Sequence, residues 1–203
     1  MNHRKFKGVS PIISSILIIG ILAIITGIAY QWGMPMIQKN IDITTLNKAE
    51  NFLRKLDNSV SDIAKTGGTE ELIFNLPGEI NINPENNTIK FSLKTSGSIY
   101  MQGGIVCFSR NCNLTEGTWG KDSYSVINAQ VDQFEEYATI TTYSIIYRNL
   151  TRGEGFNKKI YLLDIVTPGN ATIVGSENSR ISIEKIGEER GDVTKTIIKL
   201  DIK

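Results

Sequence analysis

The pattern of apolar and polar residues divides the chain into three parts. No charged side chain lies between Lys7 and Lys39, and this run exceeds the ~20 residues that a helix needs to cross the hydrocarbon core of a membrane. Residues 40–65 then place apolar side chains three or four positions apart, which predicts an amphipathic helix. After Gly68 the helical spacing ends, and short runs of β-branched and aromatic residues alternate with turn residues, which predicts short strands. The pattern predicts an α+β chain with a long N-terminal helix and a β-rich domain.

The apolar run is expected to be a membrane-spanning helix that the mature protein retains. It is longer than the ~7–15 apolar residues of a cleaved secretory signal, and no small-x-small cleavage site precedes a polar segment at its end. Arg4, Lys5 and Lys7 place its N-terminal side in the cytoplasm by the positive-inside rule. Tyr30 and Trp32 would lie at the opposite interface, so the rest of the chain would be extracellular.

Two prolines and a stripe of small residues mark this helix. Pro11 falls in the first turn, where a helix tolerates proline, whereas Pro35 is expected to kink or interrupt the helix just outside the bilayer. Gly20, Ala23 and Gly27 recur at helical spacing and are the candidate helix-packing positions, because small side chains let helices approach closely. Glycine is common in any membrane helix, so these residues alone leave self-packing open.

The second segment carries a narrow apolar stripe with charged residues on its back, and Gly67-Gly68 ends it. A short coiled coil over three heptads would fit this spacing. An amphipathic helix packed across a sheet fits it as well and is favoured. The stripe consists of Leu46, Ala49, Leu53, Leu56, Val60 and Ile63.

The third part is predicted to be a single antiparallel, sandwich-like domain of roughly 135 residues. LIFNL, EINI and TIKFSL are short runs of β-branched and aromatic residues, separated by proline, glycine and asparagine. The series continues to the end of the chain, and YATITTYSIIYRNL is its longest uninterrupted run. The final stretch, RISIEKIGEERGDVTKTIIKLDI, alternates cleanly and predicts a hairpin with one solvated face.

Composition narrows the function mainly by exclusion. The net charge of the chain is +1, and three positive charges lie in the first seven residues, so the rest of the chain has a net charge of −2. A nucleic-acid-binding domain would need a basic surface, which this charge does not indicate. The single histidine is His3, so the β-domain lacks His-based acid–base catalysis and the usual zinc sites. The pairs Glu135-Glu136 and Glu188-Glu189 fit a solvated face or turn better than a catalytic pair of acids. The segment Asn81–Asn87 contains only one acidic residue, Glu85, which makes a poor calcium site. No phosphate-binding loop is present. We expect neither an enzyme nor a bound cofactor or metal.

Cysteines and sequons both favour an exterior location. No second cysteine pair or nearby histidine could complete a metal site with Cys107 and Cys112, so a disulfide across a tight loop is favoured over two reduced cysteines. Four N-x-T glycosylation sequons lie in the β-domain, more than chance suggests, although the asparagine-rich composition raises the count. Glycans there would lie outside the cell. The candidate asparagines are Asn86, Asn113, Asn149 and Asn170.

The start of the chain resembles a known signal. Lys7-Gly8 followed by Val9-Ser10-Pro11-Ile12-Ile13-Ser14 is similar to the class III signal of archaeal type IV pilins and pilin-like proteins. In that family a membrane-embedded prepilin peptidase cuts after the glycine, and the apolar segment becomes the mature N-terminus. The resemblance is close over about 38 residues and looser over the helix-then-β layout. Bacterial pilins carry glutamate at the fifth mature position, and Ile13 stands there instead, which favours the archaeal branch.

The resemblance implies four parts and a structural role. Residues 1–8 would be a leader cleaved between Gly8 and Val9, 9–38 a transmembrane and filament-core helix, 39–66 an amphipathic helix packed on the head, and 67–203 an extracellular β-rich domain. The protein would enter the membrane first and then assemble with copies of itself as a major or minor filament subunit. Its other partners would be the peptidase, a cytoplasmic ATPase and a membrane platform.

A second hypothesis stays open beside the filament subunit. The protein could be a single-span anchor whose β-domain binds the surface layer (S-layer) or archaellum components. The expected break at Pro35 favours this anchor, whereas the Lys7-Gly8 junction favours filament assembly.

Overall fold

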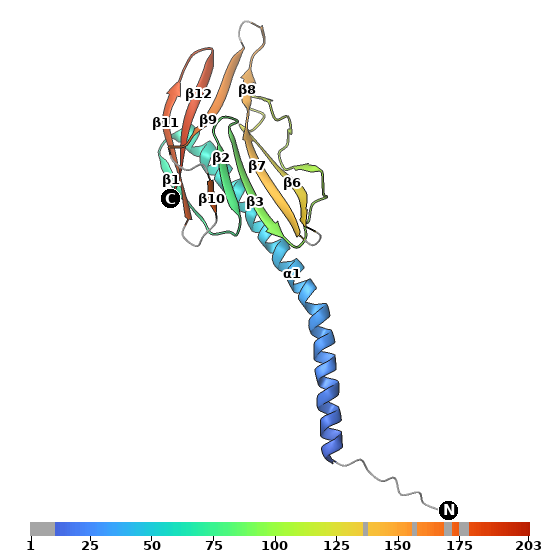
Figure 1. Ribbon diagram of the computed structural model, residues 1–203. Coiled ribbons are helices and arrows are strands. Elements are labelled where there is room, and N and C mark those ends of the chain that lie inside the picture. Colours follow the sequence, from blue (N-terminus) through green and yellow to red (C-terminus); the bar gives the residue numbers. More distant parts are fainter. Residues whose placement is uncertain (1–10, 136–137, 156–157, 169–171, 175–178) are drawn as a thin grey trace, which may run out of the picture. The chain divides into compact units, whose positions relative to one another are not determined.

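The computed structural model describes residues 11–135, 138–155, 158–168, 172–174 and 179–203 (Figure 1). The predicted processing residues Lys7, Gly8 and Val9 and the sequon residue Asn170 lie outside the described residues. The chain divides into two compact units, Met1–Ile41 and Asp42–Lys203. We call the second unit the head domain. Its boundary precedes the β-strands, so it includes the second half of the long helix.

Helix α1 spans Pro11–Thr66 and contributes to both units. In the first unit it is long and apolar enough to cross a membrane, and no residue of its most apolar stretch is buried. The expected interruption at Pro35 is wrong, because Pro35 lies inside α1 with helical residues on both sides. Proline removes one backbone hydrogen bond, and the many hydrogen bonds of a helix already formed on both sides offset that loss.

Two six-stranded sheets form the β-part of the head domain. The first sheet has the order β1 (Thr69–Phe74), β11 (Ser179–Glu189), β12 (Val193–Ile202), β9 (Lys159–Val166), β8 (Asn149–Arg152) and β5 (Glu116–Thr118). The second has the order β10 (Thr172–Val174), β2 (Glu79–Asn83), β3 (Thr88–Thr95), β7 (Ala138–Tyr147), β6 (Ser125–Glu135) and β4 (Ile105–Cys107). The α+β class with a β-sheet head is therefore confirmed.

Strand pairing is antiparallel except in two places. The pairs β12–β9 and β5–β8 are parallel, which the expectation of an antiparallel domain missed. After β9 the chain contributes β10 to the other sheet before it returns as β11 and β12, and β12 then lies beside β9 in the same direction. The predicted hairpin of the last two strands is present as the antiparallel pair β11–β12, with an irregularity between Lys185 and Gly187.

The described part of the long run, residues 138–150, does not form one strand. Strand β7 ends at Tyr147 in the second sheet, and β8 begins at Asn149 in the first, so the chain changes sheets at Arg148. The strand-like composition of this run predicted strands here but did not mark the change of sheet, because β-branched and aromatic residues lie on both sides of Arg148. Arg148 is buried, with 3% of its surface exposed.

The apolar stripe of α1 lies in the main core of the head domain. Its six residues are at most 6% exposed and belong to one cluster with residues from both sheets. The Phe74 ring, for example, lies 5.3 Å from both the Phe52 ring of α1 and the Phe91 ring of β3. The stripe thus packs against sheets within its own chain and is not available as a coiled-coil seam. Each fully buried leucine contributes about 1.5–3 kcal/mol.

Candidate functional site

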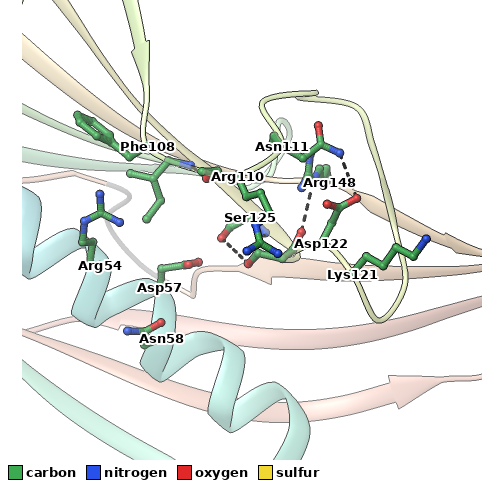
Figure 2. Close-up of a pocket in the computed structure, with 13 residues that line it drawn as sticks. Arg54, Asp57, Asn58, Phe108, Arg110, Asn111, Lys121, Asp122, Ser125 and Arg148 are labelled. Carbon is green, nitrogen blue, oxygen red and sulfur yellow. Dashed lines mark hydrogen bonds between the residues drawn. The ribbon is translucent and has the colours of Figure 1, made fainter.

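A polar cleft lies between α1, the segment from Phe108 to Tyr124 and the start of β6 (Figure 2). It has a volume of about 230 Å³. A second hollow of about 520 Å³ shares Asp57, Asn58 and Lys121 with it, among others, and extends along α1. We call the two hollows together the α1 cleft, and the segment 108–124 that forms its outer wall the wall segment.

A disulfide closes the start of the wall segment. Cys107, the last residue of β4, is bonded to Cys112. The predicted disulfide is therefore confirmed, and it limits how far the following loop can move from β4. The loop continues from there to β5, which pairs with β8.

Arg148 holds the wall segment from beneath through main-chain carbonyls. Its Nη1 donates hydrogen bonds to the carbonyl oxygens of Asn111 (3.1 Å), Asn113 and Glu116 (3.5 Å). Its Nε donates to the carbonyl oxygen of Ser123 at 3.3 Å. One buried arginine thus links four main-chain carbonyls of a segment that has little regular structure. The five donors of arginine in a fixed planar fork suit this task, which the three donors of a lysine ammonium do not.

Gly117 makes room for this arrangement. A Cβ atom at position 117 would lie 3.0 Å from Arg148 Nε and 2.8 Å from Leu150 Cδ2. Real Cβ atoms rarely approach so closely, so a larger residue here would force the Leu150 side chain, and with it the closely packed Arg148 side chain, to shift.

Asp122 fixes the other end of the wall segment. Its Oδ2 accepts hydrogen bonds from the Thr118 backbone N–H at 2.7 Å and from Asn111 Nδ2 at 3.0 Å. These two bonds, the backbone one foremost, lower the pKa of the Asp122 carboxyl. Asp122 is therefore an ionised group whose Oδ2 atom holds two parts of the loop together.

Among the described acids that line the α1 cleft, Asp57 is distinguished by a buried oxygen atom without a hydrogen-bond partner. It lies on α1 beside the apolar stripe and is 7% exposed. Its Oδ1 has no hydrogen-bond partner among the described residues, and neither has the nearby Tyr147 hydroxyl. Burial raises the pKa of Asp57; the hydroxyls of Ser125 and Tyr147 and the charges of Lys65 and Arg54 oppose this only in part.

Replacing Asp57 with asparagine is expected to stabilise the head domain at neutral pH. The folded state binds the Asp57 proton more tightly than the unfolded chain, so stability falls as pH rises from the unfolded pKa of about 3.9 towards the raised folded pKa. Asp57→Asn removes the buried charge and should raise the free energy of unfolding at pH 7 by about 1–2 kcal/mol. The gain should shrink on acidification, when the wild-type carboxyl takes up its proton.

Urea denaturation of the full chain in detergent at pH 7 and pH 4.5 measures this effect. Asp62→Asn is the matched control, because the Asp62 side chain is 75% exposed on the same helix, and it should change the free energy by less than about 0.5 kcal/mol. A less stable Asp57→Asn variant at pH 7 would contradict the assignment of Asp57 as a destabilising buried acid.

Aromatic rings line the second hollow. The Trp119 ring stacks on Tyr161 at a centroid distance of 3.9 Å and meets Tyr124 edge-on at 5.7 Å. At the other end of the cleft, Arg54 lies over the Phe108 ring at 5.4 Å. Trp119 and Tyr124 give the second hollow an aromatic wall beside its charged and polar lining residues.

None of the described residues predicted for modification or helix packing lines the α1 cleft, although Asn113 belongs to the wall segment. Asn86, Asn113 and Asn149 are exposed, and their glycosylation stays a prediction. A Cβ atom at Gly20 or Gly27 would meet no other part of the described chain within 4 Å, apart from the backbone of the helix itself. With Ala23 these glycines remain candidates for contact with another helix.

Sequence reasoning did not find the α1 cleft. Arg148 stood inside a strand-like run, and only its charge within that otherwise uncharged run could have marked it. Asp57 directly follows Leu56 of the apolar stripe. An acidic residue next to a buried leucine on a helix was the one feature of the sequence that could have indicated a polar group at the edge of the core. Within the described residues, no three His, Cys, Asp or Glu side chains gather so as to hold a metal ion.

No protein-family model, no curated protein and no solved structure matches this chain significantly.

Proposed function

We propose that this protein is a subunit of a surface filament of the archaeal type IV pilus kind, held in the membrane before assembly. The observation that carries the proposal is the exposure of α1 in the first unit. Large apolar side chains are exposed all round the helix, among them Ile12 (71%), Ile19 (66%) and Ile24 (64%). A helix that is apolar on every side is stable only in lipid or among other apolar helices.

The two environments correspond to two stages of one life cycle. As a monomer, α1 would cross the membrane with the basic leader in the cytoplasm and the head domain outside. In a filament, the apolar helices of neighbouring copies would replace the lipid. Gly20 and Gly27 would allow close helix contacts there. The Cys107–Cys112 disulfide supports an extracytoplasmic head domain, because disulfides persist mainly in oxidising compartments.

The sequence at Lys7-Gly8-Val9 supplies the link between the stages. Cleavage after Gly8 by a prepilin peptidase would remove the basic side chains of Arg4, Lys5 and Lys7, and the remaining segment, which has no charged side chain before Lys39, could then leave the bilayer. Assembly would then depend on an ATPase and a membrane platform supplied by other chains. The alternative, a single-span anchor whose head domain binds S-layer or archaellum components, needs no cleavage.

Blocking the proposed cleavage is expected to keep the protein out of filaments. Wild-type protein should appear in surface material that is sheared from cells, whereas Gly8→Leu should stay in the membrane fraction with its leader attached. His3→Ala changes the leader away from the junction and serves as the matched control, with wild-type distribution. Immunoblots of both fractions and electron microscopy of the sheared one give the measurement. Wild-type protein confined to membranes would contradict the filament and favour the anchor.

A further inference from the structure

We propose that the α1 cleft binds an acidic sugar, that is, a ring with hydroxyl groups and one carboxylate. The proposal concerns the head domain alone and does not depend on filament assembly. It is based on two unpaired cations, one unsatisfied buried oxygen and one aromatic wall, all within the same cleft of the described chain.

The cations of the cleft differ in how far the fold already uses them. Arg148 is committed to main-chain carbonyls, and Arg54 forms an ion pair with Glu50 at 2.8 Å. Arg110 and Lys121 are exposed, and neither makes a side-chain hydrogen bond or ion pair within the part of the chain that the structure describes. These two residues can therefore meet an anionic group without breaking a side-chain hydrogen bond or ion pair, although Lys121 also interacts at longer range with the Asp122 carboxylate in the same cleft.

Asp57 supplies the second, independent sign of a ligand. Its Oδ1 is buried, without a hydrogen-bond partner among the described residues, and the residue lines both hollows of the cleft. Figure 2 shows Arg54 and Arg110 on opposite sides of Asp57 in this view. A buried acceptor without a donor costs about 1–3 kcal/mol. The Oδ1 atom has almost no solvent-exposed surface, so a hydroxyl group of a ligand would donate to it, and remove that cost, once the Asp57 side chain turns towards the cleft.

The remaining lining suits a hydroxylated ring. Ser123 and Asn58 offer exposed hydroxyl and amide groups at the cleft. Trp119 and Tyr124 provide the apolar wall, against which the C–H face of a sugar ring can pack.

Other ligand classes satisfy fewer of these groups. A simple inorganic anion could pair with Arg110 but would also face Asp57 and would leave the aromatic wall unused. A neutral sugar would satisfy Asp57 but leave both cations unpaired. A carboxylate on a hydroxylated ring matches the anion-binding side and the acceptor side of the cleft together.

Titration calorimetry of the full chain in detergent micelles tests the proposal, with sodium glucuronate as the probe. We expect saturable binding of glucuronate, with glucose and inorganic phosphate each at least tenfold weaker. Arg110→Ala and Lys121→Ala should each weaken glucuronate binding about tenfold, as expected for the loss of a charge-assisted contact of about 1.4 kcal/mol. Both residues are exposed, so these variants should keep the wild-type melting temperature.

Arg152→Ala is the matched control. Arg152 is also an exposed arginine without a side-chain ion pair among the described residues, but it does not line the cleft, and its replacement should leave binding unchanged. Asp57→Ala removes the acceptor and should weaken binding at least tenfold. The proposal is overturned if glucuronate shows no saturable binding, if Arg110→Ala binds as wild type does, or if phosphate binds as tightly as glucuronate. None of these outcomes bears on whether the protein forms filaments.

Discussion

Replacing Arg148 with methionine is expected to lower the free energy of unfolding by about 3–5 kcal/mol. Methionine has a similar length but no donors. The carbonyl oxygens of Asn111, Asn113, Glu116 and Ser123 would each lose a hydrogen bond that Arg148 now donates. Because the residue is 3% exposed, solvent cannot simply take over these bonds.

Denaturant unfolding of the full chain in detergent gives the change, and hydrogen exchange locates it. Amides of the wall segment should lose protection first, because Arg148 connects that segment to the junction of β7 and β8. Arg148→Lys should recover only part of the loss, since an ammonium cannot span the four carbonyls. Arg152→Met is the matched exposed control. An Arg148→Met variant within about 0.5 kcal/mol of wild type would show that the guanidinium is not what holds the wall segment.

Placing an acid in the middle of the exposed apolar helix is expected to release the protein from membranes. Leu22 is 56% exposed in the first unit of α1. An aspartate at the centre of a membrane helix costs about 2.5–3.5 kcal/mol of insertion free energy, which corresponds to a drop of roughly a hundredfold in the ratio of inserted to non-inserted protein. Leu22→Asp should therefore move most of the protein out of alkali-washed membranes.

Asn51→Asp is the control for this experiment. It introduces the same charge on an exposed position of α1 within the head domain, where water already surrounds the side chain. It should leave membrane association unchanged. If Leu22→Asp remained in washed membranes to the same extent as wild type, the apolar helix would not be the anchor.

Features that depend on neighbours along the chain could be predicted from the sequence. The uncharged run predicted the first unit of α1, and the spacing from Leu46 to Ile63 located the buried face of its second half. The close pair Cys107 and Cys112 predicted its own disulfide, and clean alternation predicted β11 and β12. In each case the pattern and the interaction that it reports lie within a few residues or turns.

Features that depend on residues far apart in the sequence could not be predicted from it. The parallel neighbours β12 and β9 follow from the excursion of the chain through β10, which no local pattern records. Proline at position 35 would break a short helix, but the helix continues on both sides. Arg148 and Asp57 acquire their roles only when α1, the wall segment and the β7–β8 junction come together. No local sequence motif therefore predicted the α1 cleft.

The mature N-terminus of the protein in sheared surface filaments tests the central claim most directly. Mass spectrometry of N-terminal peptides, applied in parallel to the membrane fraction, gives the measurement. The account predicts a chain that begins at Val9 and is present in the filaments. A chain that keeps residues 1–8 and occurs only in membranes would contradict it.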